Sequence, residues 1–245
     1  MSPAADPTLL EARSTTQRVA RTFAIACRML PRDVRDDVYR LYLVFRTLDD
    51  LVDEGDPRAL VAVAAVEGWA AGGEPRSRET RVLAGLDRRH GLPRGAVSEF
   101  CQGMRDDLAA TAIDTEDELE CYCHRVAGTV GIVMSAVLGT SDDDTAQPRA
   151  AALGKAMQRT NILRDIDEDR ANGRIYLARE TLDRFGAPSP GLREALLRDQ
   201  IARADALYAE GVAGIVLLRS GGRAIRAAAA MYSEILRQIE RDGYG

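Results

Sequence analysis

The sequence has few aromatic residues and few cysteines. Aromatic residues make up 5 % of its 245 residues, too few for a base-stacking surface or an aromatic-rich β-sandwich. The four cysteines include no C-x-x-C pair, which argues against a zinc knuckle and favours buried thiols in a reducing compartment. Acidic residues outnumber basic ones by 38 to 33, and the net charge of −5 argues against nucleic acid as a partner.

A long hydrophobic run is also missing. The longest uncharged segment, residues 126–140, is too short to span a bilayer and predicts a buried core helix. The first residues contain no basic segment followed by an apolar one, so no secretory signal is predicted. We therefore expect a cytoplasmic protein and leave open whether it also touches a membrane surface. Its oligomeric state is left open as well.

The sequence does contain a succession of helical patterns. Ala, Leu, Arg and Glu dominate, strand patterns are nearly absent, and 46 % of the residues are hydrophobic, which is enough for a sizeable core. The length favours one large domain over residues 1–245. We predict an all-α helical bundle. Its helices are expected at residues 8–28, 33–53, 58–70, 79–90, 93–111, 115–139, 149–171, 190–218 and 222–242.

A first acidic segment, DDLVDE, occupies residues 49–54 at the end of a predicted helix. Asp49 and Asp53 are four residues apart and share one helix face. Tyr42 and Arg46 continue this face toward the start of the helix. Like charges at this spacing destabilise a helix slightly. The segment is either a solvated helix end or a site that needs two carboxylates.

A second acidic segment, NILRDIDED, occupies residues 161–169. Asn161, Asp165 and Asp169 are spaced by four residues and form one stripe on a predicted helix, which Gln158 extends. Asp167 is expected to point to solvent. A calcium-binding EF-hand loop is excluded, because its sixth position would be arginine instead of glycine and its twelfth tyrosine instead of glutamate.

Two facing pairs of carboxylates have a specific chemical use. Mg²⁺ takes one or two carboxylates together with phosphate oxygens, so the two segments predict a magnesium–diphosphate site, with Mn²⁺ as a substitute. A di-iron bundle would need Glu-x-x-His motifs, and neither His90 nor His124 follows a glutamate at that spacing.

The chain resembles the squalene/phytoene synthase family of head-to-head prenyltransferases. The likeness covers essentially the whole chain in four segments, which follow the family's order. They are TFAIACRMLP at 22–31, YRLYLVFRTLDDLVDE at 39–54, YCHRVAGTVGIVMSAVLG at 122–139 and AMQRTNILRDIDEDRANGRIYLARETLDRFG at 156–186. The resemblance implies the isoprenoid synthase fold around a central cavity, isoprenoid diphosphate substrates and release of diphosphate.

The resemblance also implies roles for individual residues. The expected metal ligands are Asp49, Asp50, Asp53, Asn161, Asp165 and Asp169. The expected catalytic residues are Asp49, Asp53, Tyr122, Asp165 and Asp169. The expected substrate-binding residues are Arg21, Tyr42, Arg46, Val126, Val130, Gly131, Gln158, Asn161, Arg164, Arg174, Tyr176 and Tyr232. Gly128 and Gly131 would leave room for an isoprenoid tail, and the segment 171–179 would close over diphosphate.

Departures from the family pattern leave alternatives for the acceptor. The first segment lacks the family's usual serines, and Ala178 stands where a proline is usual. With only four phenylalanines the cavity has little aromatic lining, so C5 to C15 diphosphates are expected in preference to C20. The first hypothesis is head-to-head condensation of two allylic diphosphates. The others are transfer to an aromatic acceptor and a non-catalytic assembly protein.

A reductive step with NADPH is not expected, although it is not excluded. The GTVG segment at 128–131 lies inside a predicted helix and does not follow a strand, so it is no Rossmann fingerprint.

Overall fold

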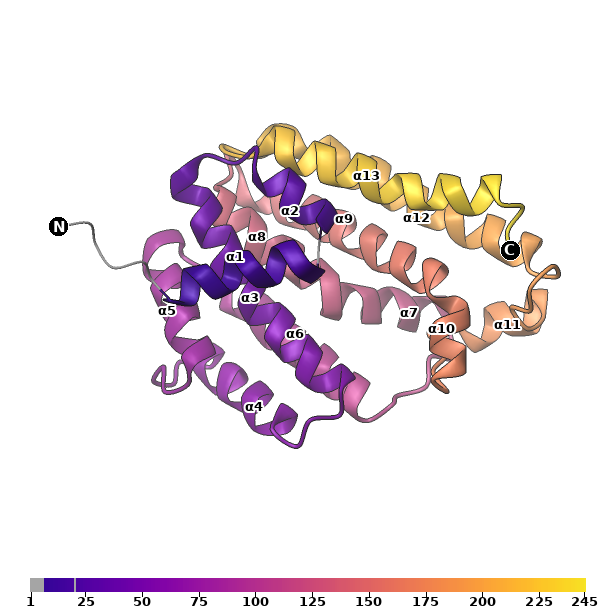
Figure 1. Ribbon diagram of the computed structural model, residues 1–245, viewed down its shortest axis with the longest axis horizontal. Helices are drawn as coiled ribbons and strands as arrows, with labels where there is room; N and C mark the ends of the chain where they lie inside the picture. The colour runs from indigo at the N-terminus through magenta and orange to yellow at the C-terminus, as the bar shows by residue number, and fades with distance from the viewer. Residues whose placement is uncertain (1–6, 20) are drawn as a thin grey trace.

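The structure is a computed structural model that describes residues 7–19 and 21–245, with only the backbone of Val19, Arg21 and Thr22 described. Over these residues the chain is helical and forms no sheet (Figure 1), which confirms the predicted all-α class. The helices are α1 (Pro7–Val19), α2 (Arg21–Cys27), α3 (Arg32–Asp53), α4 (Ala59–Ala70), α5 (Arg78–His90), α6 (Arg94–Leu108), α7 (Glu116–Cys123), η1 (His124–Gly128), α8 (Thr129–Leu138), α9 (Asp143–Arg164), α10 (Ile166–Ala171), α11 (Arg179–Phe185), α12 (Glu194–Gly214), η2 (Ile215–Leu217) and α13 (Gly222–Arg241).

The helices α7, η1 and α8 follow one another as a central rod, and α9 packs against both this rod and α12. Glycines allow the close approach. A Cβ atom on Gly154 of α9 would lie 2.2 Å from the carbonyl oxygen of Ala127, and one on Gly131 of α8 would lie 2.3 Å from that of Ala150. Since real Cβ atoms do not come that close to an oxygen, only glycine permits this packing.

The apolar core consists of two clusters. The first centres on α3, where the fully or nearly fully buried Val38, Leu41, Leu48 and Val52 recur at helical spacing and pack against α4, α5, α6 and α8. The second is formed by α7, α9, α10, α12 and α13. Apolar residues on the edges of both clusters also line a cavity between them.

The rod Glu116–Leu138 is long and apolar enough to cross a membrane by composition alone. In the structure it lies inside the bundle, with Leu119, Cys123, Val133 and Val137 buried at 2 % exposure or less. This agrees with the core helix predicted from residues 126–140.

Two of the predicted helix assignments are wrong, one at the start of the chain and one before residue 149. The segment 8–28 is not one helix, because α1 and α2 run in different directions (Figure 1). Residues 141–148, which lie between the predicted helices 115–139 and 149–171, contain the start of α9. Asp142 caps this helix by accepting a hydrogen bond from the Thr145 backbone N–H at 3.4 Å. The three consecutive aspartates Asp142–Asp144 therefore form the N-cap and part of the first turn of α9.

The predicted helix 149–171 is also interrupted. α9 ends at Arg164, Asp165 has φ −99° and ψ 9°, and α10 begins at Ile166. Hydrogen bonds continue across the bend, from Asp165 N to Asn161 O at 2.9 Å and from Asp169 N to Asp165 O at 2.8 Å. Asn161, Asp165 and Asp169 therefore follow one another along a bent backbone instead of a straight helix face.

Two further elements were not predicted. The turn His124–Gly128 is a π-helix, which places one extra residue in the central rod where it passes the cavity. The short helix α11 lies in a stretch left unassigned after residue 171. It ends at Gly186, whose φ of 88° suits glycine.

Candidate functional site

A cavity of about 330 Å³ lies at the centre of the bundle. One end is polar and the rest is apolar. The polar end is lined by Tyr42, Arg46, Asp49, Gln158, Asn161 and Tyr232. The apolar walls come from α2, α3, α6, η1, α8, α9, α12, η2 and α13, and include Phe23, Phe45, Phe100, Val126, Val130, Gly131, Met134, Leu138, Met157, Ile215, Leu218 and Ile225. Such a cavity suits a molecule with a charged head and a hydrocarbon tail.

The first acidic segment lies at the polar end. Arg46 Nη1 donates to Asp49 Oδ2 at 2.9 Å, and its Nη2 pairs with Asp50. Burial and, after it, the neighbouring Asp53 raise the pKa of Asp49 to about 7, against the opposing effect of Arg46. One arginine thus does not compensate the negative charge gathered here.

The second acidic segment lies within electrostatic reach of the first. Arg174 Nη1 donates to Asp53 Oδ1 at 3.1 Å, which joins the segment after α10 to the end of α3. Burial, Asp165, Glu168 and, more weakly, Asp53 together raise the pKa of Asp169 to about 6. The two acidic segments therefore approach from different helices, as the sequence predicted.

A carboxylate that the sequence analysis missed lies between these groups. Asp107 of α6 accepts hydrogen bonds from Tyr122 Oη at 3.1 and 3.3 Å and from Tyr176 Oη at 3.5 Å. Burial raises its pKa to about 6, and Asp53 contributes. In the sequence Asp107 belongs to the adjacent acidic pair of GMRDDL at 103–108, which lacks the four-residue spacing that marked the other two acidic segments.

The two tyrosines bound to Asp107 are part of the same network. The rings of Tyr122 and Tyr176 stack with their centroids 5.4 Å apart, and Arg174 Nη1 donates to Tyr176 Oη at 3.2 Å. Burial and the Asp107 charge raise the pKa of Tyr122 well above its usual value and that of Tyr176 to about 12. Both phenols are therefore hydrogen-bond donors at neutral pH.

The remaining polar candidates differ in placement. Asn161 Nδ2 lies 3.4 Å from Gln158 Oε1, whereas Asn161 Oδ1 is buried without a hydrogen-bond partner. Arg164 binds its neighbour Asp165 through two hydrogen bonds of 2.7 and 2.6 Å and is 44 % exposed, so it lies at the edge of the site. The side chain of Arg21 lies outside the described residues.

Asp167 lies outside the site, and the two glycines expected to leave room for the tail, Gly128 and Gly131, differ in their placement. Asp167 binds Arg193 at 2.7 and 2.8 Å and is 57 % exposed, as expected of a residue outside the site. Gly128 does not line the cavity, and a Cβ on it would meet His124 Nδ1 at 2.9 Å. Gly131 does line the cavity, but its close approach to Ala150 shows that helix packing also requires glycine there.

The donor set fits Mg²⁺ bound together with phosphate oxygens. Within the described residues no three His, Cys, Asp or Glu side chains lie close enough to hold an ion alone. The raised pKa values of Asp49, Asp107 and Asp169 reflect carboxylates that are partly buried beside other carboxylates and only partly compensated by Arg46, Arg174 and the tyrosines, and Asn161 offers a buried, unpaired oxygen. Mg²⁺ takes one or two carboxylates plus phosphate oxygens and waters, so an ion with diphosphate would complete this site.

Comparison with known proteins gives a consistent result. A family model described as squalene/phytoene synthase matches residues 16–245. A phytoene synthase from Thermus thermophilus is 37 % identical over 91 % of this chain and 80 % of its own length. A 15-cis-phytoene synthase from Synechococcus elongatus is 32 % identical over 96 % of this chain and 84 % of its own length.

Solved structures show the same likeness. A dehydrosqualene synthase in complex with a ligand superposes with a TM-score of 0.88 at 28 % identity, covering 97 % of this chain and 87 % of that one. The squalene synthase HpnC from Alicyclobacillus acidocaldarius superposes with a TM-score of 0.84 at 27 % identity, covering 97 % of this chain and 95 % of that one.

Proposed function

The chain belongs to the squalene/phytoene synthase family, and we propose that it joins two allylic isoprenoid diphosphates head to head and releases diphosphate. It is a prenyltransferase, since its relatives are such enzymes over most of their length. This removes the alternative of a non-catalytic assembly protein. The observation that carries the proposal is the set of under-compensated carboxylates from α3, α6 and α10 beside a long apolar cavity.

The polar end would hold the diphosphate head with Mg²⁺. We assign Asp49, Asp53, Asp165 and Asp169 to the ions, with Asn161 as a neutral oxygen donor. Bound ions supply positive charge that stabilises the leaving diphosphate. Mn²⁺ would serve as a substitute, and NADPH is not part of this proposal.

Arginines and tyrosines would orient the head group. Arg46 lies beside the first carboxylates, and Arg174 already reaches across from the second acidic segment to Asp53. An arginine fork matches phosphate oxygens well. We expect Arg174 and Tyr176 to exchange part of their contacts with Asp53 and Asp107 for contacts to diphosphate when the segment 171–179 closes over it.

The apolar wall would protect the reaction. When the C–O bond of one substrate breaks, its electron pair leaves with the diphosphate and an allylic cation remains. The double bond of the second substrate supplies the electrons for the new C–C bond, and loss of a proton closes a cyclopropylcarbinyl diphosphate. Phe45, Phe100, Val130 and Met134 line the cavity and would keep water away from the cation.

The length of the cavity supports a preference for shorter tails. Its apolar wall follows the central rod from Val126 to Leu138, roughly 18 Å at 1.5 Å per residue. An extended C15 tail spans roughly 14 Å and a C20 tail roughly 19 Å, from carbon–carbon bonds of about 1.5 Å. A C20 tail would press on the end of the cavity, or enter the small adjoining cavity beside Cys27, Leu30 and Val38. We therefore keep the preference for tails up to C15.

Product analysis by mass spectrometry tests the proposal. The protein is incubated with Mg²⁺ and with C5, C10, C15 or C20 allylic diphosphate, alone and with an aromatic acceptor. We expect a product with two isoprenoid tails from one substrate. A product that forms only when the aromatic acceptor is present would replace head-to-head condensation by aromatic prenylation.

A further inference from the structure

The cavity ends, far from the carboxylates, beneath a surface rich in arginine. We define the arginine face by the exposed Arg28, Arg219, Arg223 and Arg226, together with three exposed apolar side chains. These are Ile25, Met29 and Val216, which are 55 %, 52 % and 75 % exposed. They come from α2 and the turn after it, from η2 and from the start of α13.

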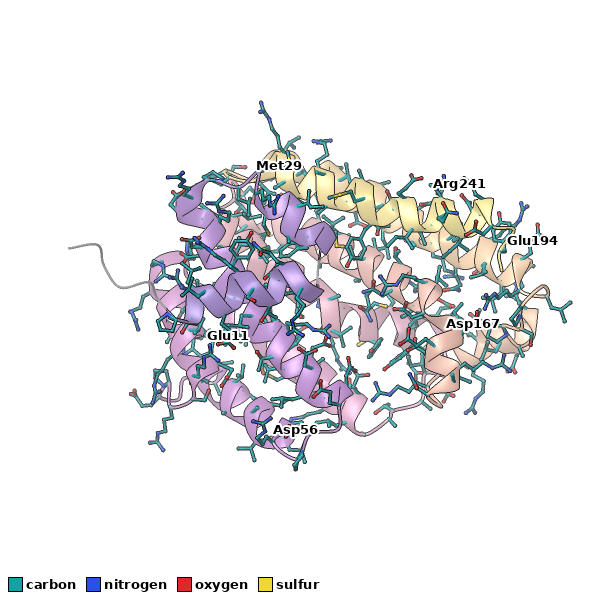
Figure 2. All side chains as sticks on the ribbon, viewed as in Figure 1. Glu11, Met29, Asp56, Asp167, Glu194 and Arg241 are labelled. Carbon is teal, nitrogen blue, oxygen red and sulfur yellow. The ribbon has the colours of Figure 1, made fainter. Side chains whose placement is uncertain are left out.

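Contacts between these segments place them at one end of the molecule. A Cβ on Gly221 would lie 2.5 Å from Leu30 Cδ2 and 3.0 Å from Leu138 Cδ2, and the Arg219 backbone N–H donates to Gly139 O at 2.9 Å. α2 packs against α13. Figure 2 shows Met29 beside the N-terminal end of α13.

The charge of this face differs from that of the whole protein. The net charge of the chain is −5, yet residues 21–32 and 211–233 contain no Asp or Glu. No side chain of the four arginines makes an ion pair or a hydrogen bond within the described residues, while arginines elsewhere are mostly paired. The acidic run Asp142–Asp144 follows Ser141, whose backbone N–H donates to Leu217 O at 2.9 Å, and in this run Asp142 accepts from Thr145 and Asp143 from Thr140.

The inner side of the same segments lines the cavity. Phe23 of α2, Ile215 of η2 and Ile225 of α13 face the apolar interior that would hold the hydrocarbon tails. Each segment is thus apolar toward the cavity and carries arginines and isolated apolar side chains toward solvent. A hydrocarbon product has low solubility in water, so its natural acceptor at this end is a lipid phase.

We propose that the arginine face docks on the surface of an anionic lipid bilayer. The four arginines would lie among lipid phosphates, and Ile25, Met29 and Val216 would enter the boundary between head groups and acyl chains. The reason for docking rests on the proposed hydrocarbon product, but binding requires neither substrate nor turnover. Failure of docking and failure of the proposed activity can therefore be distinguished.

Vesicle co-sedimentation tests the proposal. The wild type is mixed with vesicles of phosphatidylcholine alone or with about one third phosphatidylglycerol, without substrate. We expect binding to the anionic vesicles that weakens as salt rises, because the Debye length falls from about 10 Å at 0.1 M to about 3 Å at 1 M. The triple variant Arg219→Gln, Arg223→Gln, Arg226→Gln should bind roughly a hundredfold more weakly, since each basic residue near such a surface contributes about fivefold.

A matched variant separates this face from net charge. Arg76→Gln, Arg81→Gln, Arg88→Gln removes three exposed arginines around α5 that also lack ion pairs within the described chain, and changes the net charge equally. It should bind like the wild type. The proposal is overturned if the wild type does not bind anionic vesicles, or if both triple variants lose binding equally.

Fluorescence tests insertion separately. The chain has one tryptophan, Trp69, which is 2 % exposed in the core. In the variant Met29→Trp a second tryptophan lies on the arginine face, and anionic vesicles should shift its emission to the blue. An unchanged emission with vesicle-bound protein would show that another surface makes the contact.

Discussion

The ionised carboxylate of Asp107, which lies in the proposed site, destabilises the folded protein at neutral pH. The carboxylate is half-buried, its pKa is raised to about 6, and the two tyrosine hydrogen bonds do not overcome the effect of burial and of Asp53. In the unfolded chain an aspartate has a pKa near 3.9. The folded state therefore binds a proton more tightly, and the cost of ionised Asp107 grows as pH rises from about 4 to about 6.

We predict that Asp107→Asn stabilises the protein without ligands at neutral pH. A shift of about two pKa units corresponds to at most about 3 kcal/mol, and screening by solvent reduces this to about 1–2 kcal/mol. For a chain of this size the melting temperature at pH 7.5 should rise by roughly 2–8 °C. Asparagine can still accept a tyrosine hydrogen bond through Oδ1, so the network is largely kept.

The assay is thermal unfolding at pH 7.5 and near pH 4.5, with Asp106→Asn as the control. Asp106 is the adjacent residue, and it pairs with Arg125 at 2.8 Å. Its replacement should leave the melting temperature unchanged or lower it. The gain in Asp107→Asn should shrink at the lower pH, where the wild-type carboxyl is mostly protonated when folded. A gain of equal size at both pH values, or a loss at pH 7.5, would show that the ionised Asp107 carboxylate does not destabilise the folded protein.

Three other perturbations follow from the packing and the site. Gly154→Ala should lower the free energy of unfolding by about 1–3 kcal/mol, because its Cβ would meet the Ala127 oxygen at 2.2 Å. Gly95→Ala, with open space around it, should not destabilise the protein. Denaturant titration measures the free energy of unfolding of both variants. Leu138→Trp should fill the end of the cavity and move the preferred substrate toward shorter tails, seen as a changed ratio of kcat/KM for C15 over C10 diphosphate. The segment 171–179 should gain protease resistance with Mg²⁺ and inorganic diphosphate together, and equal cleavage with and without them would count against its closure.

The sequence is informative where the signal is local. Carboxylates four residues apart on a helix share a face whatever the rest of the chain does, so the spacing of Asp49 and Asp53 is enough to pair them. The approach of the second acidic segment was expected from the resemblance of whole motifs. The contact between Arg174 and Asp53 and the effect of Asp53 on the pKa of Asp169 agree with it.

Features decided by distant contacts were missed. Asp107 stands out only because Tyr122 and Tyr176, from other parts of the chain, donate hydrogen bonds to it. The π-turn His124–Gly128 and the bend at Asp165 depend on packing within the bundle, which periodicity does not record. For Gly131 the amino-acid type alone could not tell a space for substrate from a close contact between helices.

The proposed function requires the carboxylates at the polar end to bind a metal–diphosphate head. The most direct test is the Mg²⁺-dependent rate of diphosphate release from a C15 allylic diphosphate in two neighbouring variants. Asp53→Asn removes a charge that faces Arg174 and should lower the rate by at least about a hundredfold with the fold intact by circular dichroism. Glu54→Gln changes the exposed next residue and should stay within about twofold of the wild type. Equal rates in the two variants would show that Asp53 does not help to hold the metal–diphosphate head.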